Sequence, residues 1–229
     1  MIHPIEIQDL YYQYNGREEK ILNGISLQVA KGEVLGIVGL SGNGKSTLCY
    51  CICGIIPHVY KGRFEGKVLL FGDSLKEMDL ASVAKKVGIV FQDPDSQLFS
   101  PTVEDEIAFG PENLCLDREE IGKRISEALE TVGMKEHRYS NPNNLSGGQK
   151  QLIALASVLS LKPEVLIFDE AMTQIDAEGK KIIKEKICQL KNEGKTIIMV
   201  EHDFSNLDIA DRVMLLKNGK LEVFKGKLS

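Results

Sequence analysis

The chain has 229 residues, of which 43% are hydrophobic and 27% are charged. This size and composition are typical of one globular domain, or of one domain with a small subdomain. The formal net charge of −5 lacks the basic footprint of a nucleic-acid-binding domain, so we expect no nucleic-acid partner. No apolar run approaches the ~20 residues that cross a bilayer. The residues from Met1 to Glu6 have neither the basic nor the apolar region of a signal peptide.

Strands and helices are predicted to alternate along the chain. Residues 5–14 and 25–29 predict two antiparallel strands around an Asn15-Gly16 turn. Further strands are expected over 34–38, 66–71, 88–91, 165–168, 196–200, 212–216 and 220–224, and helices over 45–55, 80–86, parts of 104–134, 152–159 and about 177–190.

This order implies an α/β fold with a mostly parallel sheet that is entered through antiparallel strands. The all-helical block between about residues 100 and 145 interrupts the alternation. We therefore expect an inserted α-helical subdomain there, with residues 1–99 and 146–229 forming the core of a single domain.

The segment after strand 34–38 matches G-x-x-x-x-G-K-[ST], the phosphate-binding loop of P-loop proteins. Its residues are Gly39, Leu40, Ser41, Gly42, Asn43, Gly44, Lys45, Ser46 and Thr47. Glycines let successive N–H groups point at an anion, and the following helix adds the positive end of its dipole. We therefore predict nucleotide binding, with Lys45 against the β- and γ-phosphates and Ser46 as a ligand of Mg²⁺. The alternative is a glycine-rich turn that binds nothing.

The five cysteines are odd in number, and Cys49, Cys51 and Cys53 fall in the predicted phosphate-loop helix. A zinc site is one interpretation. Small buried apolar residues in a reducing compartment are the other, and we favour it.

An apolar strand over residues 165–168 ends in Asp169 and Glu170. Charges at the end of a buried strand are costly unless something pairs them, and ligands of open α/β sheets bind at these strand ends. We expect Asp169 to hold Mg²⁺, directly or through water, and Glu170 to polarise the water that attacks the γ-phosphate.

The segment Leu145-Ser146-Gly147-Gly148-Gln149 predicts a second helix start that suits a phosphate. Ser146 is a plausible N-cap, and the two glycines allow close approach to the backbone. One nucleotide does not need both helix starts from one chain. The economical interpretation is that the second serves a nucleotide held by another subunit; the alternative is a helix start without a ligand.

With these motifs, the chain resembles the ATP-binding subunit of ABC transporters over essentially its whole length. Gly39 to Ser46 is similar to the Walker A loop, Leu166 to Glu170 to the Walker B strand, and Leu145 to Gln149 to the ABC signature. The resemblance implies a P-loop ATPase that binds ATP and Mg²⁺ and hydrolyses ATP.

Three further residues take roles from this resemblance. Gln92 is similar to the Q-loop glutamine, which contacts Mg²⁺ and the attacking water, and His202 to the switch histidine, which reaches the γ-phosphate. Tyr14 is placed like the aromatic residue that stacks on adenine. Tyr11 and Tyr12 remain alternatives for that role, and core packing is an alternative for all three.

A narrower resemblance, to the energy-coupling-factor importers of vitamins, cobalt and nickel, is carried by residues 90–99 (VFQDPDSQLF) and 102–113 (TVEDEIAFGPEN). It implies a peripheral protein at the cytoplasmic face of the cell membrane. Its partners would be a second ABC ATPase subunit, identical or related and placed head to tail, a transmembrane T component and a substrate-binding S component. The family docks the T component between the Q-loop and the helical subdomain.

Two departures from the family are visible. Residues 171–176 read Ala-Met-Thr-Gln-Ile-Asp, where the family usually has a Pro-Thr-Ser-Ala-Leu-Asp-like run. Asp176 is kept, and we expect the change in the middle to alter communication across the dimer or the symmetry of its two sites. Many energy-coupling-factor ATPases also continue into a C-terminal dimerising extension. We expect none here, because the given sequence ends at Ser229, soon after its last predicted strand pair.

The alternatives are non-transport or regulatory ABC ATPases. The DNA-repair type is disfavoured because no heptad repeats lie between the Walker A loop and the signature. Ribosome-associated members carry two ATPase domains in one chain. A catalytically silent regulatory subunit is disfavoured because Lys45, Asp169, Glu170 and His202 are all present.

Overall fold

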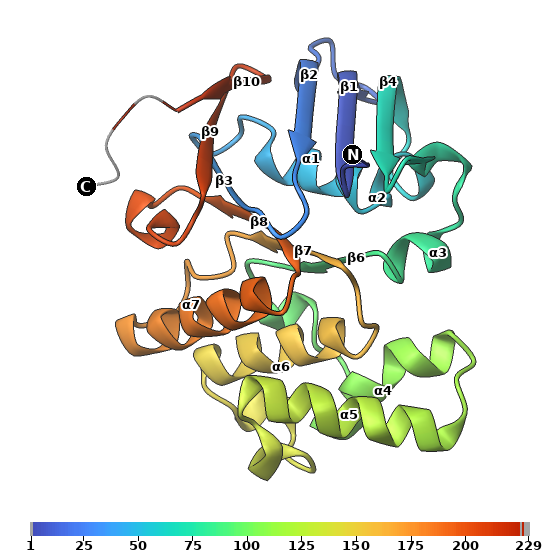
Figure 1. Cartoon of the computed structure of the whole chain (residues 1–229), viewed down its shortest axis with the longest axis vertical. Helices are drawn as coiled ribbons and strands as arrows, with labels where there is room; N and C mark the ends of the chain where they lie inside the picture. Colours follow the sequence, from blue (N-terminus) through green and yellow to red (C-terminus); the bar gives the residue numbers. More distant parts are fainter. Residues whose placement is uncertain (1, 225, 227–229) are drawn as a thin grey trace.

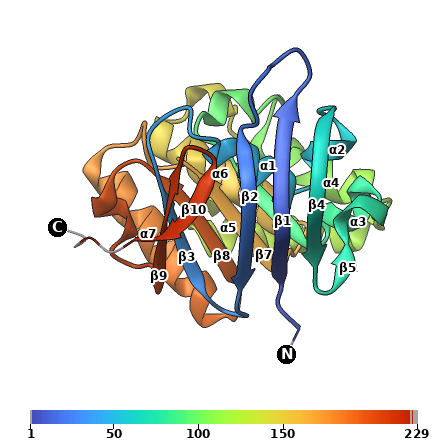
Figure 2. The ribbon, with the colours of Figure 1, turned by 90° about the horizontal axis from the view of Figure 1, so that it is seen from above.

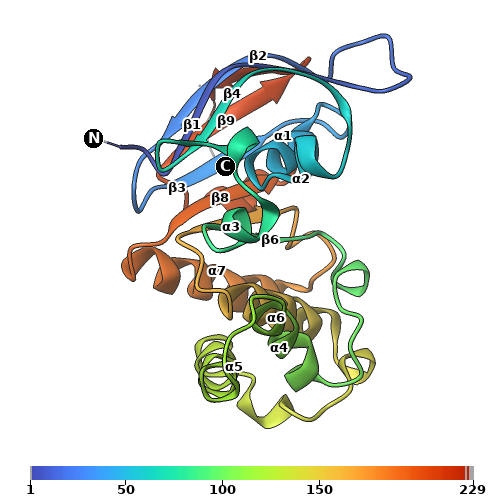
Figure 3. The ribbon, with the colours of Figure 1, turned by 90° about the vertical axis from the view of Figure 1, so that its right-hand side faces the viewer.

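The computed structural model describes residues 2–224 and 226, which form two β-sheets and a layer of helices. In Figure 1 an antiparallel sheet lies at the top, a second sheet crosses the middle, and helices α4 to α7 lie below it. The side view in Figure 3 places α1 and α2 between the two sheets. The molecule is thus layered, and the second sheet is covered on both faces.

The first sheet is antiparallel and has the strand order β2-β1-β4-β5. Its strands are β1 (Ile5–Tyr14), β2 (Leu22–Val29), β4 (Gly62–Leu70) and β5 (Asp73–Ser74). Along β1 the buried side chains change from Ile5 and Ile7 to Leu10 and Tyr12. A bulge at Asp9, whose φ is 46°, moves the buried set by one position and keeps it on the same face.

The second sheet has the order β10-β9-β3-β8-β7-β6. Its strands are β3 (Val34–Val38), β6 (Val87–Val90), β7 (Val165–Asp169), β8 (Thr196–Glu201), β9 (Arg212–Lys217) and β10 (Lys220–Val223). All neighbours are parallel except β10 with β9. Seen from above in Figure 2, β3, β8 and β7 cross behind the antiparallel sheet.

The central strands β3, β7 and β8 are buried along their whole length, as expected for parallel strands with both faces covered. Successive side chains point to opposite faces, so Leu35 and Ile37 pack with α1 and the first sheet. Val34 and Val38 belong to the other apolar cluster, on the side of the helices.

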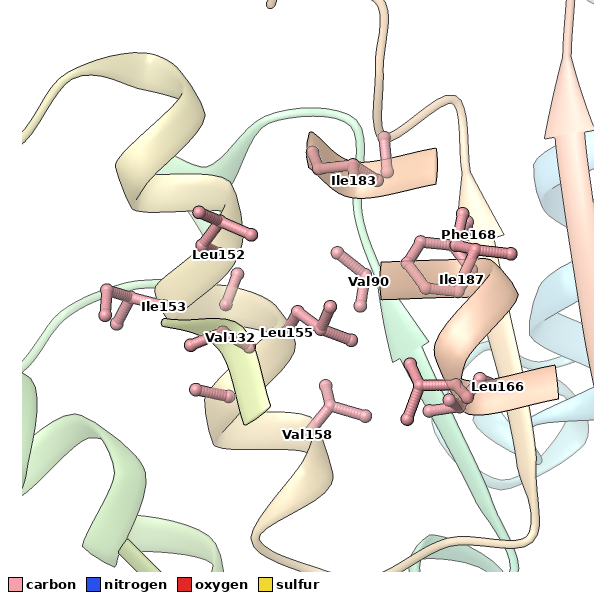
Figure 4. Packing of buried hydrophobic residues seen from close by; sticks show 14 of the residues in the cluster. Val90, Val132, Leu152, Ile153, Leu155, Val158, Leu166, Phe168, Ile183 and Ile187 are labelled. Atoms are coloured by element: carbon pink, nitrogen blue, oxygen red, sulfur yellow. The ribbon is translucent and has the colours of Figure 1, made fainter. Parts of the chain in front are cut away.

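The helices are α1 (Lys45–Ile52), α2 (Ile55–His58), α3 (Leu80–Ala84), α4 (Val103–Asn113), α5 (Arg118–Val132), α6 (Gly147–Leu159) and α7 (Ala177–Asn192). Helix α6 packs against the second sheet. In Figure 4 its Leu155 lies next to Val90 of β6, with Phe168 of β7 and Ile187 of α7 beyond.

The predicted α/β class, with a mostly parallel sheet and an antiparallel entry, is confirmed. Several elements differ from the expectation: β2 begins at Leu22 and not at 25, α6 begins at Gly147 and not at 152, and β5 was not predicted. Two further differences have a clear physical cause. Helix α1 ends at Ile52, short of residue 55, because Gly54 takes a left-handed φ of 77°. Strand β4 begins at Gly62, not at 66, because its polar first half pairs with the end of β1. The boundary of the helical subdomain near residues 100–145 remains a proposal.

No helix within residues 2–224 combines the length and the apolar character needed to span a membrane.

Candidate nucleotide-binding site

The phosphate loop joins the buried strand β3 to helix α1. Gly42 and Gly44 have φ values of 81° and 94°, in the region that glycine adopts without strain. Gly44 is the N-cap of α1, and no side chain caps this helix start. The first N–H groups of α1 therefore remain available to an anion.

Lys45 is the first residue of α1, and its side chain is only 4% exposed. Its Nζ donates to the carbonyl oxygens of Gly39 at 2.9 Å and Leu40 at 3.3 Å, and lies 3.0 Å from Glu170 Oε1. A buried ammonium group is costly without partners. The loop carbonyls and Glu170 supply them.

A cavity of about 460 Å³ opens beside the loop, a size common for small-molecule sites. Its lining comes from β1, the β1–β2 loop, the phosphate loop and the ends of β6 and β7: Tyr14, Arg17, Glu19, Lys20, Ile21, Ser41, Gly42, Gly44, Lys45, Ser46, Thr47, Gln92 and Glu170. Half of the predicted site residues thus line one cavity. The β1–β2 loop residues were not predicted, because no sequence pattern marks them.

Asp169 ends β7 and is 5% exposed, and its Oδ1 has no hydrogen-bond partner among the described residues. Burial raises the pKa of Asp169, while the Ser46 hydroxyl and then the charge of Lys45 oppose this. An unpartnered carboxylate oxygen near a hydroxyl at the phosphate-loop helix is the hard-oxygen environment that Mg²⁺ prefers. Asp169 and Ser46 therefore fit Mg²⁺.

The zinc interpretation of the cysteines gains no support. Cys49, Cys51 and Cys53 are buried and free, and burial raises the pKa of all three thiols. Within residues 2–224 and 226, no group of three or more His, Cys, Asp or Glu side chains is placed to hold a metal.

Glu170 adopts a left-handed backbone with a φ of 54°, which is uncommon outside glycine and frequent at functional sites. Its N–H donates to Val200 of β8 at 2.8 Å. The carboxylate then lies between Lys45 and His202: Oε1 faces Lys45, and Oε2 lies 3.5 Å from His202 Nδ1. The His202 side chain is half exposed, so a ligand bound beside Glu170 could contact it.

Of the three N-terminal tyrosines, Tyr14 lines the cavity. Its hydroxyl lies 3.1 Å from Thr47 Oγ1, and its ring packs edge-on against Tyr12. Tyr12 is buried in the core, and Tyr11 lies under the Lys20 ammonium group at 4.4 Å. Tyr14 therefore remains the candidate for contact with a base.

The predicted residues Gly39, Leu40 and Asn43 frame the loop and do not line the cavity. A Cβ at Gly39 would collide with the Leu216 carbonyl of β9, and Asn43 Nδ2 donates to the same carbonyl at 3.4 Å. Leu40 is 80% exposed. Strand β9 thus supports the back of the phosphate loop.

The signature residues lie elsewhere. Ser146 is the N-cap of α6 and forms a capping box with Gln149: the Gln149 N–H donates to Ser146 Oγ at 3.3 Å, and the Ser146 N–H to Gln149 Oε1 at 2.9 Å. Gln149 Nε2 also lies 3.3 Å from His137 Nε2. The Gln149 side chain is therefore engaged within its own chain.

Ser146, Gly147, Gly148 and Gln149 line a separate cavity of about 380 Å³, together with residues 174–176 of the unusual segment. The two phosphate-suited helix starts of the chain thus open into different cavities, as the two-subunit hypothesis requires.

Comparison with known proteins agrees with this geometry. The sequence model of the family described as "ABC transporter" matches residues 22–173. The chain belongs to this family. It is an ABC-type ATPase domain, so the resemblance predicted from its motifs is confirmed.

Several relatives are similar over nearly all of the chain. A Methanosarcina acetivorans protein whose name also describes an ABC transporter ATP-binding protein is 48% identical over 219 residues, which are 95% of this chain and 34% of that protein. This chain thus spans about a third of that relative, and 38% of the similar protein of Methanosarcina mazei.

Some relatives of more similar length carry a narrower name. The energy-coupling factor transporter ATP-binding protein EcfA of Methanosarcina acetivorans is 40% identical over 95% of this chain and 77% of its own. Among solved structures, CbiO1 from Clostridium perfringens, described as part of the ABC transporter complex CbiONQ, has a TM-score of 0.86 at 33% identity. The match covers 97% of this chain and 88% of CbiO1.

Proposed function

We propose that the chain is the ATP-binding and ATP-hydrolysing subunit of an energy-coupling-factor importer, at the cytoplasmic face of the membrane. The observation that carries the proposal is the single cavity shared by the phosphate loop, Gln92 and Glu170, beside Asp169 and His202. The names of EcfA and CbiO1 support the importer subtype. A vitamin or a transition-metal ion is then the proposed class of cargo.

The residues of the cavity divide the work between binding and proton transfer. Lys45 would exchange its contact with Glu170 for the β- and γ-phosphates, which releases the Glu170 carboxylate toward the attacking water. His202 would orient that carboxylate from its other side. Ser46, Asp169 and Gln92 would hold Mg²⁺, which neutralises phosphate charge when bound.

The signature requires a second copy or a related chain. In a head-to-tail pair, Ser146, Gly147 and Gly148 of one subunit would cover the nucleotide on the phosphate loop of the other. The γ-phosphate is the group that reaches both surfaces, so its removal opens the pair. A transmembrane T component and a substrate-binding S component are the proposed membrane partners, because they would convert closure and opening into transport.

The substitution Glu170→Gln tests this function. It keeps the shape of the side chain and removes the base, so we expect ATP binding to remain while hydrolysis falls by about 10²–10⁴-fold. With saturating ATP, the variant should elute from a sizing column as a dimer.

The matched control is the double variant Lys45→Ala/Glu170→Gln, which should stay monomeric because its nucleotide site is lost. If Glu170→Gln also stays monomeric with saturating ATP, the two-subunit mechanism is wrong for this chain.

A further inference from the structure

Helix α6, which begins at the signature, is attached to β6 and to the Gln92 loop at three levels. Near its end, Val158 packs against Gly88, where a Cβ would collide with it. Closer to its start, Gln151 Nε2 donates to the Phe91 carbonyl at 2.8 Å. One residue earlier, Lys150 Nζ lies 2.6 Å from Asp95 Oδ1. The attachment therefore continues past β6 into the loop itself.

Gln97 closes the loop from the other direction. Its Oε1 accepts from the Phe91 N–H at 3.1 Å, and its Nε2 donates to the Ile89 carbonyl at 3.3 Å. Strand β6 is at the edge of its sheet, where backbone groups lack a neighbouring strand. The Gln97 amide supplies one donor and one acceptor in place of that strand. The Ile89 carbonyl and the Phe91 N–H therefore both have hydrogen-bond partners.

The turn between these contacts is held by Asp93. Its Oδ1 accepts from the Asp95 N–H at 3.1 Å, and its carbonyl accepts from Ser96 Oγ at 2.6 Å. This short turn directs Asp95 toward Lys150. Asp93, Asp95 and Gln97 all belong to the distinctive segment 90–99, and none of them lines the nucleotide cavity.

We propose that Gln97, Lys150 and Gln151 are positioning residues. Together with Asp95 they form a clasp that makes the Gln92 loop and the Ser146 helix start move as one body. Phe91, which accepts from Gln151 and donates to Gln97, is the neighbour of Gln92, and Gln151 lies on the helix that Ser146 caps. A shift of Gln92 toward bound nucleotide would therefore tilt the signature. The proposal rests on the proposed function only for the roles of Gln92 and Ser146.

Hydrogen–deuterium exchange of the purified full chain tests the clasp without any need for activity. Lys150→Ala should speed exchange of residues 91–97 by about two- to fivefold, since a partly exposed ion pair is lost. Gln151→Leu should speed it by about tenfold, because the Phe91 carbonyl loses a buried partner. Conversely, Asp95→Ala and Gln97→Ala should speed exchange at residues 146–151.

Lys150→Arg keeps the charge and should exchange as the parent chain does. Lys191→Ala is the matched control, because it removes a lysine–aspartate pair, with Asp211, on the far end of α7. Unchanged exchange at 91–97 in both Lys150→Ala and Gln151→Leu would overturn the clasp.

A kinetic test separates a positioning role from a merely structural one. Lys150→Ala and Asp95→Lys should lower the kcat for ATP hydrolysis about two- to fivefold with little change in KM, and the swap Asp95→Lys/Lys150→Asp should recover most of it. A fall in ATP affinity equal to the fall in kcat would overturn the positioning role. If the parent chain binds no ATP, the proposed function fails, while the exchange experiment still decides on the clasp.

Discussion

Glu201 is a buried carboxyl group whose titration should control the pH dependence of stability. It ends β8 with 0% exposure; its Oε2 accepts from Asn206 Nδ2 at 3.1 Å, and its Oε1 has no partner among the described residues. Burial raises the pKa of Glu201 from its ordinary value of 4.5 to about 7. The Asn206 hydrogen bond and Lys180 oppose this shift, and Glu170 and Asp203 add to it.

The direction in which stability changes with pH follows from proton binding to Glu201. Between pH 4.5 and 7 the folded chain holds a proton on Glu201 that the unfolded chain has released, so stability falls as the pH rises. The proton contributes fully to the free energy of unfolding below pH 4.5, the pKa of Glu201 in the unfolded chain. This contribution is lost as the pH rises through about 7, the pKa of Glu201 in the folded chain. Integrated from pH 5 to pH 8, the loss is roughly 2–3 kcal/mol.

The substitution Glu201→Gln removes the titration and keeps an oxygen for Asn206. We expect its free energy of unfolding, relative to the parent chain, to rise by roughly 2–3 kcal/mol between pH 5 and pH 8. Urea unfolding at several pH values measures this difference. Glu185→Gln, on the exposed face of α7, is the control and should follow the parent. If the curves of Glu201→Gln and the parent run parallel, the buried-carboxyl reasoning is refuted.

Two further substitutions test the phosphate loop and the packing of α6. Lys45→Ala removes the buried ammonium group and should weaken ATP binding by at least about tenfold in a titration with a fluorescent ATP analogue; unchanged binding would remove the phosphate-loop assignment. Gly88→Ala places a methyl group against Val158 and should lower the free energy of unfolding by about 1–3 kcal/mol in urea. Adding Val158→Ala should return part of that loss, and an equal loss in both variants would contradict the close packing.

The sequence predicts the elements whose causes are local. The phosphate loop is recognisable because its glycines and Lys45 stand at a fixed spacing within one short segment. Strands β3 and β7 are recognisable because buried parallel strands are continuous apolar runs. The first half of β4 is polar and becomes a strand only through its pairing with β1, so local reasoning misses it. The cavity residues Arg17, Glu19, Lys20 and Ile21 are also brought in by tertiary packing alone.

Some polar side chains also have roles that depend on tertiary packing and not on local sequence. Gln151 and Gln97 resemble surface residues in the sequence, yet Gln151 is 2% exposed and both satisfy the backbone around Phe91. The partner of Gln151 is Phe91, 60 residues earlier in the chain, and the partners of Gln97 lie before the turn that precedes it, so no period or spacing reveals them. Glu201 was likewise not singled out from the sequence. The family resemblance implies a role for the adjacent His202 and none for Glu201.

Strand order explains why the candidate groups meet and why the signature does not join them. The phosphate loop, His202, Glu170 and Gln92 follow β3, β8, β7 and β6, four adjacent parallel strands. The carboxyl ends of such strands share one edge of the sheet, where ligands bind in open α/β folds. Ser146 instead begins a helix that lies against the sheet, and it opens into its own cavity. Since no strand end delivers Ser146 to that edge, a second subunit is the economical source of the signature over each nucleotide.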